Sequence, residues 1–168
     1  MQLGFLFWLF FVGLIIASLQ DLKRREIDNW LNLFLLSTSF VYIFYKGLLE
    51  GNIEIIFLGI FSLIILFCFM NLLYYGKVFG GGDAKLLFAM SAFFVSGSFG
   101  MTITNIFLFL SLLMLSGFIY IMTYIFILYL INPQLINLKK SEIPFAPVFL
   151  ISFLIYVFFR IKFISLLL

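Results

Sequence analysis

The sequence predicts an all-α integral membrane protein that crosses the bilayer about six times. Of its 168 residues, 65% are hydrophobic and only 10% are charged, and the mean hydropathy is +1.28. Soluble domains average about 45–50% apolar and about 25% charged residues, so a water-soluble fold of this length could not hide so much apolar surface. The formal net charge of +3 is small and scattered along the chain, which indicates no nucleic-acid partner.

Six apolar runs are long enough, or nearly so, to span a bilayer, which takes about 20 residues per helix. They cover approximately residues 3–19, 30–45, 53–75, 84–95, 102–131 and 144–159. The second, fourth and sixth runs are near the short limit. No internal repeat or soluble domain interrupts the pattern, so residues 1–168 are predicted to form a single membrane-embedded domain.

Lysine and arginine predict the orientation, because they concentrate in cytoplasmic loops. With the first polar loop inside, the inner side holds Lys23, Arg24, Arg25, Lys77, Lys85, Lys139 and Lys140. The outer side then holds only Lys46, Arg160 and Lys162. The first run has its basic cluster after it, the reverse of a cleavable signal peptide, and is predicted to stay as an anchor. We therefore expect a multi-pass protein of the cell membrane with its N-terminus outside.

The absence of histidine and the presence of only one cysteine exclude whole classes of chemistry. The chain has no histidine, which excludes Ser-His-Asp and Cys-His catalysis and histidine-ligated zinc or haem. Its one cysteine, Cys68, lies in an apolar run and is predicted to be a small buried hydrophobic residue. No metal site and no cofactor is predicted.

Asp21 and Asp83 each adjoin a predicted membrane helix. Asp21 ends the first run and Asp83 precedes the fourth, so two crossings separate them and both lie on the cytoplasmic side. Two carboxylates in contact share a proton over a broad pH range. Such a pair can activate water, one member acting as general base and the other as general acid, as in aspartic proteases.

Three glycines, Gly80, Gly81 and Gly82, stand directly before Asp83. They leave room for a substrate strand to approach the acid, and they tolerate the non-helical dihedral angles expected where the fourth helix begins. The competing interpretation is structural, because aspartate is a good N-cap for a following helix.

The remaining acidic residues fall into two groups. Glu50 and Glu54 lie in a predicted external turn, where solvation explains them. Glu26, Asp28 and Glu142 lie among basic residues in predicted cytoplasmic loops, where solvation or ion pairing is expected.

Three stretches together resemble the type IV prepilin peptidases and archaeal preflagellin peptidases, which are membrane aspartic proteases with a GxGD motif. They are DLKRREIDNWL at 21–31, GGGDAKLL at 80–87 and IPFAPVFLIS at 143–152. The resemblance covers essentially the whole chain. It implies that Asp21 and Asp83 are the catalytic pair, and that Pro144 and Pro147 belong to a motif that supports the site.

The resemblance also implies a substrate: prepilin-like or archaellin precursors, whose leader has a basic stretch, usually a glycine, and then a long apolar helix. Cleavage is expected at the cytoplasmic membrane face, just before that helix. Glu26, Asp28 and Glu142 would then be partners for the positive charges of the leader. The chain departs from the family at Asp28, where Ile-Pro-Asn is usual. It lacks the cytoplasmic cysteine-rich domain of the larger enzymes and looks like the compact, peptidase-only branch, without methyltransferase activity.

Two alternatives remain open from the sequence. A presenilin-like protease would cut inside an apolar helix, but its partner aspartate follows tyrosine, whereas Gln20 precedes Asp21 here. A non-catalytic transport or assembly subunit would use the two acids as a proton or cation site. Against a transporter, the helices show no inverted repeat, and the acids lie at helix ends.

Overall fold

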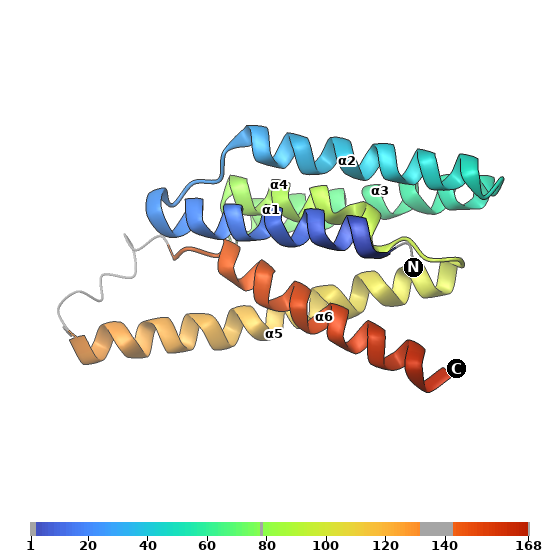
Figure 1. Cartoon of the computed structure of the whole chain (residues 1–168). Helices are drawn as coiled ribbons and strands as arrows, with labels where there is room; N and C mark the ends of the chain where they lie inside the picture. The colour runs from blue at the N-terminus through green and yellow to red at the C-terminus, as the bar shows by residue number, and fades with distance from the viewer. Residues whose placement is uncertain (1–2, 78, 132–142, 168) are drawn as a thin grey trace.

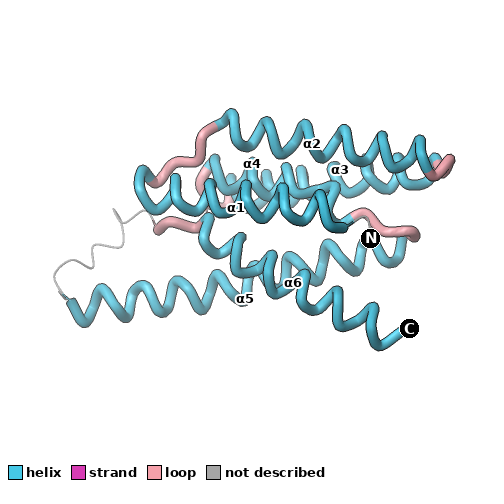
Figure 2. The backbone as a smooth tube through the Cα atoms, in the orientation of Figure 1, coloured by secondary structure: helices cyan, strands magenta, loops and turns pink. Residues whose placement is uncertain are grey.

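The structure is a computed structural model, which describes residues 3–77, 79–131 and 143–167. Its helices are α1 (Leu3–Arg24), α2 (Asn29–Leu49), α3 (Ile53–Tyr75), α4 (Gly81–Ala89), the 3₁₀ helix η1 (Met90–Phe94), α5 (Phe99–Ile131) and α6 (Ala146–Leu167). The described part contains no strand, and the loops drawn in pink in Figure 2 are short. This confirms the predicted all-α class and the order of its six helical runs.

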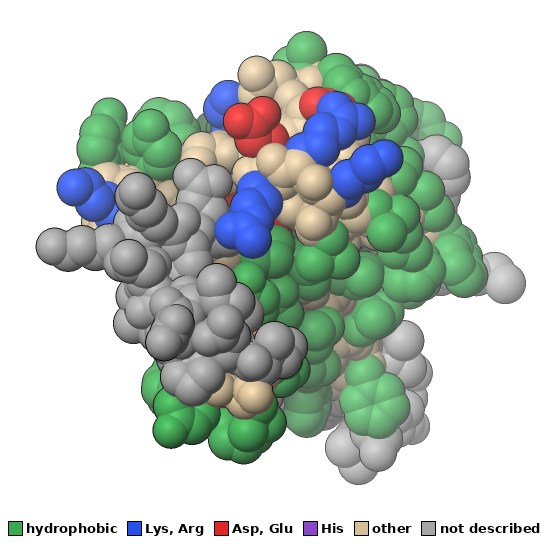
Figure 3. All heavy atoms as spheres, turned by 90° about the vertical axis from the view of Figure 1, so that its left-hand side faces the viewer, with side chains coloured by type: hydrophobic (Ala, Val, Ile, Leu, Met, Phe, Trp, Pro, Cys, Tyr) green, Lys and Arg blue, Asp and Glu red, His purple; other side chains and the backbone are tan. Residues whose placement is uncertain are grey.

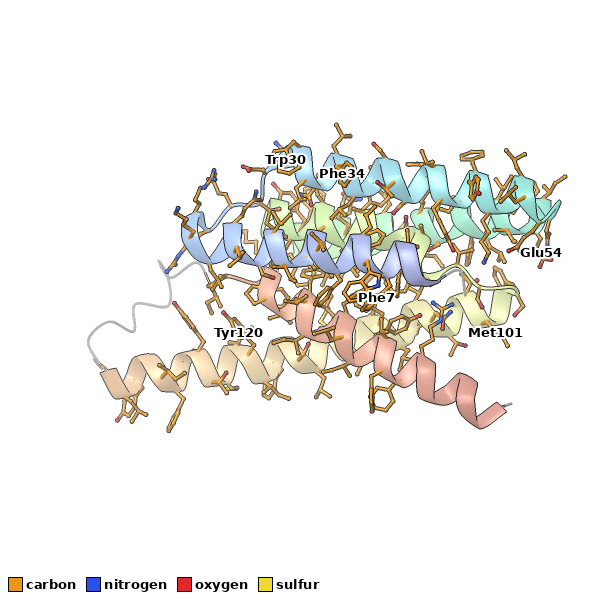
Figure 4. The ribbon with its side chains drawn as sticks, in the orientation of Figure 1. Phe7, Trp30, Phe34, Glu54, Met101 and Tyr120 are labelled. Atoms are coloured by element: carbon orange, nitrogen blue, oxygen red, sulfur yellow. The ribbon has the colours of Figure 1, made fainter. Side chains whose placement is uncertain are left out.

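The long helices have the length and composition of membrane spans. Within the described residues, four are long and apolar enough to cross a bilayer: 6–24, 29–49, 53–75 and 99–127. A shorter apolar stretch covers Ala146–Arg160. Large apolar side chains cover the outside of the bundle, as Trp30 and Phe34 do on α2 (Figure 4). Water would disfavour such a surface and lipid favours it, so the chain is a polytopic membrane protein. The number of crossings stays a prediction.

Cys68 contradicts the expectation of burial, because its side chain is exposed on α3. It lies among other outward-facing apolar residues of that helix, including Ile64 and Phe67. A cysteine that faces lipid and one in the protein core are both in apolar surroundings, so an apolar run does not distinguish them.

Successive helices run in opposite directions (Figure 1). The end of α1 and the starts of α2, α4 and α6 therefore meet at one end of the bundle, which we call the acid end because it carries Asp21 and Asp83. Figure 3 views this end, where lysine, arginine and acidic side chains gather on an otherwise hydrophobic surface. Exposed residues here include Lys23, Arg24 and Lys85.

The fourth helix is shorter than predicted. It begins at Gly81 instead of near Ala84, ends at Ala89, and continues as the 3₁₀ turn η1. Every residue of η1 is buried. A helix that breaks inside the bundle leaves carbonyl groups without helical partners, and these are costly where no water reaches them.

Side chains from four surrounding helices satisfy those carbonyls. Ser39 donates to the carbonyl of Ala89, Ser62 to Ser91, Asn105 to Phe94 and Arg160 to Phe93. The donors come from α2, α3, α5 and α6 respectively. These bonds supply partners for the backbone at the place where the helix breaks inside the bundle.

Candidate active site

Asp21 lies in the last turn of α1 and is only 5% exposed. The helix ends immediately afterwards, because Arg25 adopts a left-handed backbone with φ 57°. One carboxylate oxygen of Asp21, Oδ2, accepts a hydrogen bond of 2.8 Å from the backbone N–H of Ala146, the first residue of α6. Burial disfavours the ionised form of Asp21, whereas the N-terminus of a helix attracts negative charge, so the Ala146 contact acts in the opposite direction and favours it.

Asp83 is the third residue of α4 and is 9% exposed. Burial, followed by the charge of Asp21, raises the pKa of Asp83 from 3.8 to about 7, although a backbone hydrogen bond from Gly80 opposes the rise. Its Oδ1 atom is buried and has no hydrogen-bond partner among the described residues. Asp83 is therefore suited to carry a proton near neutral pH.

The N-cap interpretation of Asp83 is wrong. Gly80 occupies the N-cap position of α4, and no side chain caps the helix there. Asp83 instead stands inside the first turn, where its carboxyl group lines a cavity.

Asp21 and Asp83 both line a cavity of about 990 Å³ at the acid end. Its lining includes Asp21, Asp83, the three glycines and Glu26. Among the described residues, no three acidic or cysteine side chains are grouped as metal ligands would be. The arrangement is thus two buried carboxyl groups that line one cavity, and hydrolysis by a carboxyl pair uses such an arrangement.

Gly80 and Gly82 are closely packed, Gly81 is not, and none of the three has a positive φ. Gly80 has φ −68° and ψ 162°, so the backbone is non-helical where α4 begins, as expected, although other residues adopt these angles as well. A Cβ at Gly82 would lie 3.1 Å from Cβ of Ile27, and one at Gly80 would lie 3.3 Å from Oδ2 of Asp83. A Cβ at Gly81 would meet Tyr74 at an ordinary 3.6 Å.

If the two acids cleave a leader-bearing precursor as the sequence predicts, alanine at Gly82 should slow that cleavage by about 10-fold or more, because the crowding displaces the turn that carries Asp83. Alanine at Gly81 is the matched control and should stay within about threefold of the unaltered protein. The measurement is the initial cleavage rate of a precursor peptide, with helix content checked by circular dichroism. Equal rates for the two variants would contradict the crowding argument.

The predicted loop residues Pro144 and Pro147 lie at the start of α6. Pro144 is buried just before the helix, and Pro147 is its second residue, where a missing N–H costs nothing. Between them, the ring of Phe145 packs on Phe79 with ring centroids 4.7 Å apart. These contacts hold the Ala146 N–H against Asp21, whereas neither proline lines the cavity. Glu142 lies outside the described residues.

Several cavity residues were not predicted from the sequence. Tyr74 and Tyr75 end α3, Lys77 lies in the loop after it, and Ile121 comes from α5. Tyr120, the neighbour of Ile121, extends from α5 into the space between that helix and the rest of the bundle (Figure 4). The sequence signal for Tyr74, Tyr75 and Lys77 is that they lie a few residues before the three glycines.

Comparison with known proteins decides the family. Residues 8–122 match the type IV leader peptidase family, and this match covers more than half of the chain, including Asp21 and Asp83. The chain belongs to the type IV leader peptidase family. The resemblance inferred from the three motifs is thereby confirmed, although the match ends before the third motif at 143–152.

The relatives that the comparison found include archaeal preflagellin peptidases. The preflagellin peptidase of Methanococcus voltae is 34% identical over 88 residues, which make up 52% of this chain and 37% of that protein. The preflagellin peptidase of Methanococcus maripaludis is 31% identical over 81 residues, or 48% of this chain and 35% of the relative. The matched parts thus span little more than a third of each relative. No solved structure matches the chain.

Asp28 marks the departure from the proline usual in the family, and the structure gives a physical account of it. Its φ of −61° is the angle that a proline would impose. The side chain of Gln20 donates to the Asp28 carboxylate at 2.9 Å and accepts from the Asp28 N–H at 3.1 Å. Trp30 also donates to this carboxylate, and Arg24 lies 3.8 Å from it. Asp28 does not line the cavity, so these contacts support a role in shaping the loop and not in contacting a substrate.

Proposed function

We propose that the chain is a membrane aspartic endopeptidase that removes the short basic leader from prepilin-like or archaellin precursors. Membership of the type IV leader peptidase family supports this proposal, as do relatives named preflagellin peptidase. The observation that carries it is the pair of buried acids, Asp21 and Asp83, lining one cavity at the end of the bundle.

The proposed mechanism uses the different surroundings of the two acids. Asp21, stabilised as a carboxylate by the Ala146 N–H, takes a proton from a water that attacks the scissile carbonyl carbon. Asp83 gives its proton to the carbonyl oxygen, which yields a neutral diol. When the C–N bond breaks, Asp21 returns its proton to the leaving nitrogen and Asp83 recovers one from the diol. Both acids then regain their starting states.

The cavity wall suggests how a precursor would lie. The edge formed by Gly80 to Gly82 carries no side chain, so an extended peptide can approach Asp83 along it. Glu26 is exposed at the cavity and would attract the basic leader, whereas the carboxylate of Asp28 is engaged within the loop. We therefore assign the charge contact to Glu26.

The position of the cut tests this function. The full-length chain in liposomes should cleave a precursor only between its basic leader and its apolar helix, since the cavity lies at the end of the bundle. Mass spectrometry of the products locates the cut. Products cut within the apolar helix would instead support the presenilin-like alternative, and failure to cleave any leader-bearing precursor would refute the proposal.

We also propose that the acid end faces the cytoplasm, as the distribution of basic residues favours. In a Cys68→Ser background, a cysteine at Lys23 should react with a membrane-impermeant thiol reagent only after cells are opened. A cysteine at Glu54, at the opposite end, should react in intact cells. The reverse pattern would place the site outside and contradict the proposed route of the precursor.

A further inference from the structure

Asn32 is a buried amide on the face of α2 that packs against α4, and the mechanism above does not use it. Its side chain is 4% exposed. Its Nδ2 donates a hydrogen bond of 3.3 Å to the carbonyl oxygen of Gly82. Because Gly82 directly precedes Asp83, Asn32 contacts the turn that carries the acid.

This hydrogen bond differs from the others that hold α4 and η1. Ser39 and Ser62 donate to carbonyls where the α-helix ends or has become η1, so the backbone there needs a partner. Gly82 lies at the start of α4, and a carbonyl in that position accepts an N–H from four residues further along the helix. The Asn32 bond is therefore additional to what the backbone requires.

Asn32 also keeps an unfavourable group in the interior. Its Oδ1 is buried and has no hydrogen-bond partner among the described residues. A buried polar atom without a partner lowers stability, and leucine, which has a similar size, would avoid this cost. A residue that costs stability at a tightly packed contact indicates a need other than folding.

The start of α2 and the loop before it contact the first two turns of α4 at several points. Ile27, two residues before α2, packs so closely on Gly82 that a Cβ there would lie 3.1 Å away. On the outer side, Lys85 Nζ donates to Oδ1 of Asn29 at 2.7 Å. Asn32 supplies the buried hydrogen bond of this contact, and this bond aligns the first turn of α4 along α2.

We propose that Asn32 is a positioning residue for Asp83: its amide fixes the Gly82 carbonyl, and with it the depth at which Asp83 faces Asp21 across the cavity. The proposal rests on the proposed function. A shift of about 1 Å in a reacting group can cost about 100-fold in rate, so a bond next to the acid acts on catalysis through geometry.

The experiment compares Asn32→Leu with Ser62→Ala in liposomes, using kcat and KM for a precursor peptide and the melting temperature in detergent. Ser62→Ala removes a buried side-chain bond to the same segment, distant from the acid, and should leave kcat within about threefold. Asn32→Leu should lower kcat by about 10- to 100-fold with KM nearly unchanged, while the melting temperature stays equal or rises.

Three results would overturn the inference. One is a kcat of Asn32→Leu close to that of the unaltered protein. Another is an equal loss of kcat in Ser62→Ala. The third is loss of folded protein in both Asn32→Leu and a second variant, Asn32→Ala, which would show a purely structural role. If the unaltered protein cleaves nothing, the proposed function fails first and this inference fails with it, whereas an active protein with active Asn32 variants refutes the inference alone.

Discussion

Asparagine at either Asp21 or Asp83 should lower the cleavage rate by about 10³- to 10⁵-fold, as replacing one member of a catalytic unit does in other proteases. Asparagine keeps the shape of the side chain but cannot exchange a proton with water or substrate. Asp21→Asn removes the base that the Ala146 N–H holds ionised, and Asp83→Asn removes the acid. The measurement is single-turnover cleavage of a precursor peptide by the purified full-length chain.

The matched control is Asp28→Asn, which makes the same chemical change at a carboxylate outside the cavity. An asparagine there can still accept a hydrogen bond from Gln20, so the rate should stay within about threefold. Folding provides a second control. Asp83→Asn should not lower the melting temperature above neutral pH, because it removes the cost of a buried charge. A folded Asp83→Asn variant with near-normal activity would exclude the acid from the chemistry.

The cleavage rate should fall steeply as the pH rises through neutrality. Burial and the neighbouring Asp21 raise the pKa of Asp83 to about 7, so its proton is present below this pH and lost above it. We expect kcat to fall by about tenfold per pH unit above pH 7, which reaches about 100-fold by pH 9. A flat profile between pH 6 and pH 9, measured on protein shown to remain folded, would contradict the role of Asp83 as the proton donor.

The stability of the folded protein should also depend on pH through Asp83, and it should fall as the pH rises. The folded state keeps the Asp83 proton up to about pH 7, whereas the unfolded chain releases it near the ordinary value of 3.8. The stability that this proton contributes is therefore fully present below about pH 4 and is lost as the pH rises towards about 7. In Asp83→Asn this part of the pH dependence of the melting temperature should vanish.

The sequence predicted the helices and the two acids because both depend on simple constraints. A span needs about 20 apolar residues, so long apolar runs identify α1, α2, α3 and α5. Counting crossings then places Asp21 and Asp83 at the same end, where the structure also has them. The side of the membrane on which the charged loop residues lie was likewise predicted from their position between the apolar runs alone.

Other features depend on contacts that no local pattern reveals. The break of the fourth helix at Met90 lies in an apolar stretch, and the polar groups that stabilise it, such as Ser62 and Arg160, are distant in sequence. Asn32 stands alone in an apolar run, and only the fold shows that it faces Gly82. The sequence shows that Asp28 carries a charge, which predicts contact with a basic leader. It does not show that Gln20 folds back to donate a hydrogen bond to Asp28, because this depends on the shape of the loop.

The claim that Asp21 and Asp83 act as one unit is tested most directly by a double-substitution cycle on cleavage of one precursor peptide. The rates of the unaltered protein, Asp21→Asn, Asp83→Asn and the double variant are measured under identical conditions, with product detected by mass spectrometry. If the two acids share one proton-transfer cycle, the double variant should be within about threefold of the slower single variant. A double variant slowed by the product of the two single losses would show that the acids act independently, and it would contradict the account.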